Sequence, residues 1–122
     1  MAASEAGPLA QSGGLGDVLR ALPPALVSLG HTVRRFLPAY GDIDRAGFGR
    51  EETNLAVPLG AARLPVRFLT RVEASKVHTT LVECEELFAR PGIYGPPGGE
   101  YRDNARRFTL LSRAVCEYAA RA

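Results

Sequence analysis

The sequence contains few cysteines and no long apolar run, and each shortage excludes a class of protein. Cys84 and Cys116 are the only cysteines, too few for a disulfide framework. We expect both to be buried, unreactive residues of a protein from a reducing, cytoplasmic compartment. A stretch of about 18 apolar residues is missing, which excludes a transmembrane helix. The first residues lack the basic and apolar segments of a secretory signal, which is excluded as well.

Lysine is also scarce, because fourteen arginines and a single lysine, Lys76, supply the basic charge. The arginines are spread along the chain without a basic block or interleaved aromatics, so we do not expect nucleic acid as a partner. Neither a cluster of metal ligands nor a carboxylate pair with acid–base spacing stands out, so we expect no metal or other cofactor. The length of 122 residues allows one domain at most, which is too little for a site between two domains.

Glycine and proline, in contrast, are abundant, with 13 and 9 residues that gather in two loops at 7–16 and 91–99. Between the loops, helical and strand-like hydrophobic periods alternate. The periods predict the end of a strand at residues 1–4, a helix at 17–29, strands at 32–37, 54–59, 63–72 and 76–82, one helical turn at 85–89, and a last helix that Asp103 caps and that ends near Ala120. This order predicts an α/β fold with an open, mostly parallel sheet and an antiparallel hairpin insertion.

Particular residues refine these predicted elements. Pro23 and Pro24 should kink the first helix near Leu22, and Gly30 stands where a C-terminal cap belongs. The last helix has a predicted buried stripe, and its arginines, Arg107 among them, are expected to lie off that stripe. The residues of the stripe are Phe108, Leu111, Val115 and Tyr118.

The loop at residues 11–17, with the sequence QSGGLGD, is the first candidate site. Its glycines permit close approach of the backbone to a ligand, and the amides that open the following helix favour an anion such as a phosphate or the diphosphate of a nucleotide sugar. A plain tight turn is the other interpretation. Leu19 stands where G-x-G-x-x-G needs glycine, and Asp17 follows Gly16 where a P-loop needs lysine, so neither of these signatures fits.

Four further polar residues each have a structural and a ligand-binding interpretation. Asp17 complements the start of the first helix or accepts a hydrogen bond from a sugar hydroxyl. Glu5 follows a strand end, where α/β sheets place their ligands. Asp103 is adequately explained as a helix cap, although with Asn104 it would also suit the recognition of hydroxyl groups.

Two blocks of the sequence resemble the bacterial glycogen synthases and the plant starch synthases. The N-terminal signature of that family reads S-E-x-x-P-x-x-K-x-G-G-L-[GA]-D-V, and residues 4–18 match it as SEAGPLAQSGGLGDV. The second block, LFARPGIYG at 87–95 followed by YRDNARRF at 101–108, matches independently. The two blocks stand in the family's order, and the resemblance covers nearly the whole chain.

The resemblance implies a retaining glycosyltransferase of the GT-B fold, which has two Rossmann-like domains. Such enzymes transfer glucose from ADP-glucose to the non-reducing end of an α-1,4-glucan without a metal. By position, Gly13 and Gly14 would lie against the phosphate–glucose end of the donor, with Gln11 at the place of the signature lysine. The carboxylates of Asp17 and Asp103 and the amide of Asn104 would face the glucose, and Glu5 and Tyr94 would support the site.

Three departures qualify this expectation. Gln11 offers only a neutral donor where the signature has lysine. The family's first strand begins several residues before the Ser-Glu pair, so we expect here either a truncated start or an unusually short first strand. We also expect the C-terminal nucleotide-binding domain of the family to lie outside these residues. We therefore expect residues 1–122 to be an incomplete N-terminal, acceptor-side domain of a GT-B fold, inactive alone, with the main catalytic residues outside it.

Two alternatives remain open at this point. A non-catalytic module that binds glucan or a partner protein is favoured by Gln11 and by the short length. The other is a GT-B transferase that uses a different sugar-nucleotide donor.

Overall fold

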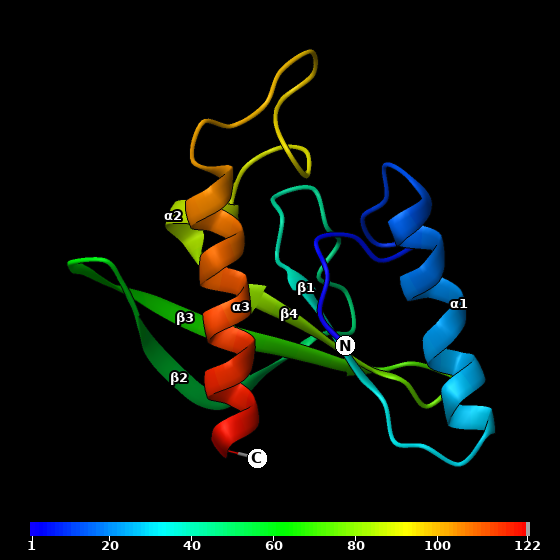
Figure 1. Ribbon diagram of the computed structural model, residues 1–122. Helices are drawn as coiled ribbons and strands as arrows, with labels where there is room; N and C mark the ends of the chain where they lie inside the picture. The colour runs from blue at the N-terminus through cyan, green and yellow to red at the C-terminus, as the bar shows by residue number, and fades with distance from the viewer. Residues whose placement is uncertain (122) are drawn as a thin grey trace.

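The computed structural model describes residues 1–121, which form a four-stranded sheet with two long helices packed on it (Figure 1). Figure 1 shows the second long helix crossing in front of the strands. The elements in chain order are α1 (Gly14–Ser28), β1 (Arg34–Pro38), β2 (Gly49–Leu59), β3 (Ala62–Val72), β4 (His78–Glu83), α2 (Glu85–Phe88) and α3 (Asn104–Arg121). The predicted helices and the four strands predicted from residue 32 onward are present, with ends that differ by up to five residues, whereas residues 1–4 form only an isolated bridge.

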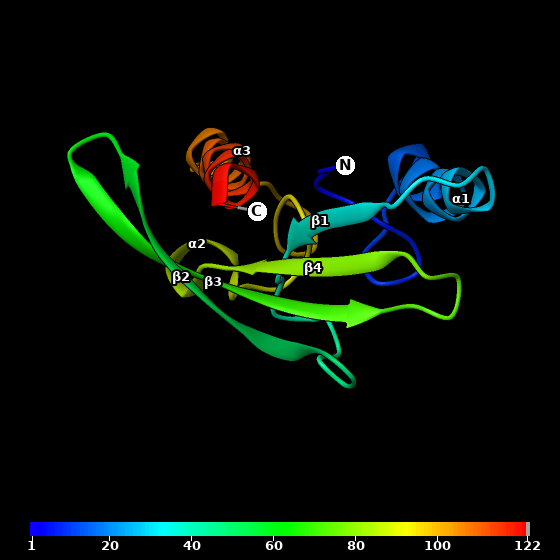
Figure 2. The ribbon, with the colours of Figure 1, turned by 90° about the horizontal axis from the view of Figure 1, so that it is seen from below.

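The sheet is mixed, in the order β1-β4-β3-β2 (Figure 2). Only β1 and β4 pair in parallel, with Arg34 opposite His78, whereas β3 pairs antiparallel with both β4 and β2. The prediction of a mostly parallel sheet is therefore supported only in part, by the β1–β4 pair, and the predicted antiparallel hairpin makes up half of the sheet. The physical reason is the short connections, because a tight turn at Gly60 and another at Lys76 join strands that can only run antiparallel.

Residues 1–4 lie along the free edge of β1, as the predicted end of a strand. Ala2 forms an isolated parallel bridge with Phe36, and the Ala3 amide donates to the Phe36 carbonyl oxygen at 3.1 Å. The N-terminal segment, α1 and β1 thus form a β-α-β unit.

The two long helices lie on opposite faces of β1. Phe36 contacts α3, where its ring centroid is 5.2 Å from that of Tyr118. The neighbouring Arg35 reaches α1, where its Nη1 donates to the Leu19 carbonyl oxygen at 2.9 Å. Because successive strand residues point to opposite faces, these two contacts place α1 and α3 on opposite sides.

Helix α1 departs from its prediction at its start. It begins at Gly14, three residues earlier than predicted, and it continues through Pro23 and Pro24 to Ser28. Proline at position 23 has no N–H for the Leu19 carbonyl oxygen four residues earlier, and Arg35 supplies the missing donor. The predicted cap is confirmed, since Gly30 has φ of +97° and its amide donates to the Val27 carbonyl oxygen.

Three other predictions are wrong. Arg107 was expected off the buried stripe of the last helix, yet it is fully buried beside Leu110 and Ala114. Four aromatic rings surround the guanidinium of Arg107, and Leu110 and Ala114 are buried beside the predicted Leu111. Cys116 is exposed, unlike the buried Cys84. The fourth strand starts at His78 rather than at residue 76, because Lys76 has φ of +71° and belongs to the turn.

No helix within residues 1–121 is long and apolar enough to cross a membrane.

Candidate functional site

The two signature loops and the loop after β1 meet at one end of the sheet. Figure 1 shows these segments together at the top of the molecule, beyond the carboxyl ends of β1 and β4. In α/β sheets, ligands bind outside the carboxyl ends of the parallel strands. The fold therefore gathers the candidate residues where a ligand site is expected.

Glu5 links the two signature loops. Its carboxylate is buried and accepts hydrogen bonds from the Ser12 amide at 2.8 Å, the Gly13 amide at 3.0 Å and the Ser12 hydroxyl at 3.0 Å. The Tyr94 hydroxyl, from the second loop, donates to the same carboxylate at 2.6 Å. Burial alone would raise the pKa of Glu5, but these hydrogen bonds outweigh it and lower the pKa to about 2.

The Glu5 carboxylate thus occupies two amides of the glycine-rich loop that were expected to face a ligand anion. The next amides in the chain, those of Gly14 and Leu15, open the first turn of α1 and have no carbonyl oxygen four residues earlier in the helix. Both residues are exposed. An anion at this loop would therefore meet the start of α1 at Gly14 and Leu15 rather than at Gly13.

Gln11 lies folded over the same loop. Its Nε2 donates to the Asp17 carboxylate at 2.6 Å and to the Gly13 carbonyl oxygen at 3.3 Å. A Cβ atom at Gly16 would collide with Cγ and Cδ of Gln11, and one at Gly7 would displace the Gln11 Oε1 atom, so the folded position of Gln11 depends on glycine at both places. The structure therefore joins Gln11 and Asp17 to one another, and a ligand role for either remains a prediction.

The second signature loop is held at its base by Asp103 and Asn104. Arg90 donates two hydrogen bonds to the Asp103 carboxylate, at 2.7 and 2.9 Å. Because the donor is charged, this hydrogen bonding lowers the pKa of Asp103. The Asn104 Nδ2 donates to the Tyr94 carbonyl oxygen at 2.8 Å. Asp103 stands directly before α3, as predicted for a cap, but its carboxylate binds Arg90.

Tyr94 projects from this loop toward the N-terminal segment. Its hydroxyl lies 2.7 Å from the Ser4 hydroxyl as well as against Glu5. Burial raises the pKa of Tyr94, and its hydrogen bond to the Glu5 carboxylate raises it further. The hydroxyl therefore stays protonated and donating at neutral pH.

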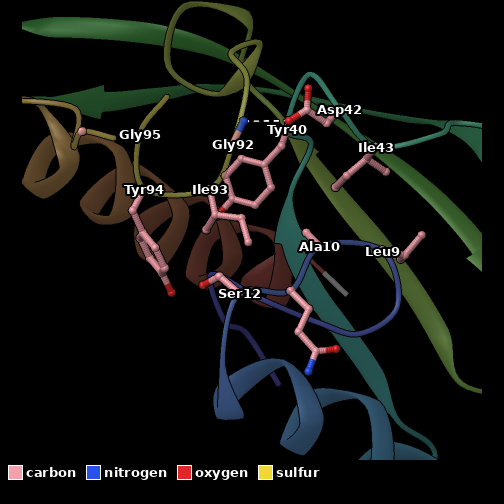
Figure 3. Close-up of a pocket in the computed structure, with 12 residues that line it drawn as sticks. Leu9, Ala10, Ser12, Tyr40, Asp42, Ile43, Gly92, Ile93, Tyr94 and Gly95 are labelled. Atoms are coloured by element: carbon pink, nitrogen blue, oxygen red, sulfur yellow. Dashed lines mark hydrogen bonds between the residues drawn. The ribbon is translucent and has the colours of Figure 1, made fainter. Parts of the chain in front are cut away.

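A pocket of about 430 Å³ opens between the three loops (Figure 3). Figure 3 shows Tyr40, Ile93 and Tyr94 lying across the pocket from Leu9 and Ala10. One charged residue, Asp42, is among those that line it, and its carboxylate accepts a hydrogen bond from the Gly92 amide at 2.7 Å. The lining residues are Leu9, Ala10, Gln11, Ser12, Tyr40, Asp42, Ile43, Gly92, Ile93, Tyr94, Gly95 and Gly99.

The predicted site residues divide into two groups. Gln11 and Tyr94 line the pocket itself. The others lie in the loops around it, and the Tyr94 hydroxyl joins the two signature blocks through its hydrogen bonds with Glu5 and Ser4. That second group comprises Glu5, Gly13, Gly14, Asp17, Asp103 and Asn104.

Sequence reasoning gave no role to Tyr40 or Arg107, which the structure places next to this site. Tyr40 is buried, its hydroxyl donates to the Ser4 carbonyl oxygen at 2.6 Å, and burial raises its pKa. A signal existed for Arg107, because it belongs to the second block that resembles the family. Within residues 1–121, no group of acidic, histidine or cysteine side chains could hold a metal ion.

A pocket with aromatic rings, backbone amides, hydroxyls and one carboxylate suits a neutral ligand rich in hydroxyl groups. Sugars are such ligands. The exposed start of α1 next to it suits a phosphate.

Comparison with known proteins gives consistent results. The family described as the starch synthase catalytic domain matches residues 1–122. A glycogen synthase of Dechloromonas aromatica is 42% identical over 93% of this chain, and one of Geotalea uraniireducens is 39% identical over 94%. Each match covers 24% of the relative, so this chain spans about a quarter of their length.

A solved structure agrees with these relatives. The catalytic domain of starch synthase IV from Arabidopsis thaliana, bound to ADP and acarbose, superposes with a TM-score of 0.76 at 26% identity. The match covers 98% of this chain and 24% of that one. The mixed α/β arrangement described above is thus one that a larger protein also contains.

Proposed function

The chain belongs to the starch synthase catalytic-domain family, and from this membership we propose that it is part of a glycogen synthase. The parent protein would transfer glucose from ADP-glucose to the non-reducing end of an α-1,4-glucan, with retention and without a metal. The observation that carries this proposal is the bond between Glu5 and Tyr94, which joins both signature loops around one pocket. The compartment would be the cytoplasm.

In this proposal, residues 1–122 are the acceptor-side part of a two-domain GT-B enzyme. The start of α1 at Gly14 would lie against the phosphate–glucose end of the donor. Asp17 and Asn104 would face the glucose only after giving up their present partners, Gln11 and the Tyr94 carbonyl oxygen. The glucan would enter the pocket, where the rings of Tyr40 and Tyr94 present flat apolar surface next to hydroxyl groups.

The chain alone should be inactive, because the domain that would hold the nucleotide lies outside it. The test is a transfer assay with radiolabelled ADP-glucose and glycogen. We expect no incorporation of label by the isolated chain, and elongation of glycogen would contradict the proposal.

Binding can be tested without turnover. We expect titration with ADP-glucose or with glucose 1-phosphate to move the amide resonances of Gly13 to Asp17 in NMR spectra. Changes confined to other regions would count against a donor site at this loop. The substitution Gly14→Pro removes one backbone N–H of the loop, and proline is tolerated at the first position of a helix. This variant should therefore bind ADP-glucose more weakly.

A second candidate is a module that binds glucan without catalysis. The specific observation in its favour is that Gln11 brings no positive charge and is already bonded to Asp17, while the pocket is nearly neutral. Titration with maltoheptaose distinguishes the two functions. Shifts at Tyr94 and Tyr40 with maltoheptaose, and none at Gly14 with ADP-glucose, would favour the glucan-binding module.

A further inference from the structure

Arg107 is the largest side chain that the described residues bury completely. It lies in the first turns of α3, and its three hydrogen bonds go to neutral oxygens. Nε donates to the Leu87 carbonyl oxygen at 2.7 Å, and Nη1 donates to the Ile93 carbonyl oxygen and to Asn104 Oδ1, both at 2.8 Å. One guanidinium thereby ties α2, the second signature loop and the start of α3 together.

Four aromatic rings surround the same guanidinium. The Arg107 Cζ atom is 4.7 Å from the ring centroid of Tyr101 and between 5.4 and 5.8 Å from those of three other rings. Such distances permit cation–π attraction in a desolvated setting. The other three rings belong to Tyr40, Phe88 and Phe108.

The buried charge is not explained by stability alone. Nη2 of Arg107 is buried and has no hydrogen-bond partner within residues 1–121, and burial lowers the pKa of the side chain. An apolar side chain of similar volume often serves a core as well as a buried charge does. Arginine at this position is instead suited to bonding several carbonyl oxygens in fixed directions at once.

The hydrogen-bond partners of Arg107 connect it to the candidate site. Ile93 precedes Tyr94, and Asn104, which accepts from Arg107, donates to the Tyr94 carbonyl oxygen at 2.8 Å. The Tyr94 hydroxyl then donates to Glu5, whose carboxylate accepts from the Gly13 amide. An unbroken series of hydrogen bonds and covalent links therefore joins Arg107 to the glycine-rich loop.

We propose that Arg107 is a positioning residue, which fixes the second signature loop so that the Tyr94 hydroxyl reaches Glu5 and shapes the glycine-rich loop for its ligand. The part of this inference that concerns a ligand rests on the function proposed above. The positional part does not, because it concerns only the arrangement of Tyr94 and Glu5.

The test follows the ionisation of Glu5 by carbon-13 NMR of the carboxyl groups in the 122-residue chain. In the wild-type chain we expect the Glu5 carboxyl to be ionised at about pH 3.5, since its pKa is about 2. In Arg107→Met the loop is released and Tyr94 no longer donates, so the pKa of Glu5 should rise, while the bonds from Ser12 and Gly13 still hold it below its ordinary value. Arg107→Lys keeps the charge but lacks the planar fork, so its Glu5 pKa should also rise, by a smaller amount.

The matched control is Arg113→Met, which removes an exposed arginine of the same helix and should leave the titration of Glu5 unchanged. A purely structural role predicts a lower melting temperature for Arg107→Met with the pKa of Glu5 unchanged, and that result overturns the proposal. If Arg107→Met does not fold, Arg107→Lys and Asn104→Ala decide, because either must raise the pKa of Glu5 if the coupling exists.

Ligand binding separates this inference from the proposed function. If ADP-glucose and maltoheptaose bind the wild-type chain, we expect Arg107→Met to weaken the binding about tenfold, while Arg113→Met binds normally. If neither ligand binds the wild-type chain, the proposed function fails, and the titration of Glu5 still judges the role of Arg107.

Discussion

The carboxylate oxygens of Glu5 accept hydrogen bonds from donors of the protein itself. Its partners come from the adjacent loop and from Tyr94, which is 89 residues away in the chain. The pKa of about 2 in the folded chain lies below the ordinary 4.5. A carboxylate with a lowered folded pKa stabilises the fold above the unfolded pKa, and this stabilisation disappears as the pH falls toward the folded pKa.

The first prediction follows from this pH dependence of the stabilisation by Glu5. Glu5→Gln should lower the free energy of unfolding at pH 7 by up to about 3 kcal/mol, which is the free-energy equivalent of the pKa difference. The gap between wild type and variant should narrow from about pH 4.5 downward. Urea unfolding at pH 7, 4 and 3 measures it, with Glu100→Gln as the control because that carboxylate is exposed. A gap that is independent of pH would contradict the prediction.

The sequence allowed the position of Glu5 to be predicted but not its partners. A strand end before a glycine-rich loop is a local pattern, whereas the approach of Tyr94 depends on packing between distant segments. Arg107 shows the same limit in a sharper form. Helical periodicity treats a charged residue as exposed, and the four rings that make its burial possible are contributed mainly by other parts of the chain.

At the scale of elements, a hydrogen bond joins α1 to β1 at a carbonyl oxygen that Pro23 leaves without a donor from the helix. Pro23 cannot donate to the Leu19 carbonyl oxygen, and Arg35 from β1 donates to it at 2.9 Å. Arg35 also donates to Thr79 at 2.9 Å and to the Gly7 carbonyl oxygen at 3.1 Å. The sequence predicted a kink or a tightening at this proline, and the structure shows that Arg35, from a strand, supplies the missing hydrogen bond.

The second prediction is a coupling between these two positions. Arg35→Met should cost about 2–4 kcal/mol of unfolding free energy, because buried oxygens lose their donors. Adding Pro23→Ala supplies an N–H for the Leu19 carbonyl oxygen and should return about 1 kcal/mol in that background only. Urea unfolding of the single and double variants measures the coupling.

Pro24→Ala is the matched control for this cycle. Its new N–H would face the Arg20 carbonyl oxygen, so it should not rescue Arg35→Met. Equal effects of the two alanine substitutions would show that the bond between Arg35 and Leu19 is not the cause.

The strands of the sheet were predicted, but the antiparallel direction of the β3–β4 pair was not. Alternating apolar residues such as Leu64, Val66 and Phe68 identified the hairpin strands correctly. The pairing of β3 with β4 could not be read from that alternation, because periodicity marks a strand but not its neighbour. The turn at Lys76, with its positive φ, decides the direction.

At the scale of the whole molecule, α3 is held at both ends, at its start to α2 and the second signature loop and near its end to the sheet. Arg107 holds its start, and near its end the Tyr118 hydroxyl donates to the Glu51 carboxylate of β2 at 2.7 Å. The Tyr118 ring also packs against Phe36 and Phe68, with centroids 5.2 and 4.7 Å away. One side chain thus connects a helix to three strands, since Phe36 belongs to β1 and Phe68 to β3.

The third prediction separates the hydroxyl of Tyr118 from its ring. Tyr118→Phe keeps the aromatic contacts and should lower the free energy of unfolding by about 1–2 kcal/mol, because a hydrogen bond to a carboxylate is lost. Thermal or urea unfolding measures the change. Ser112→Ala removes an exposed hydroxyl that bonds within the same helix and should change stability by less than about 0.5 kcal/mol. Equal losses in the two variants would contradict the assignment.

The parallel pair of β1 and β4 has a consequence for the time course of folding. Its two strands lie far apart in the chain, with Arg34 opposite His78, and the β2–β3 hairpin occupies the stretch between them. A hairpin closes locally and early, whereas distant strands must wait until loop-closure entropy has been overcome. By closing at Gly60, the hairpin shortens the loop of chain that must still close before β1 pairs with β4. The β1–β4 pair, whose carboxyl ends adjoin the candidate site, should therefore be the last part of the sheet to assemble.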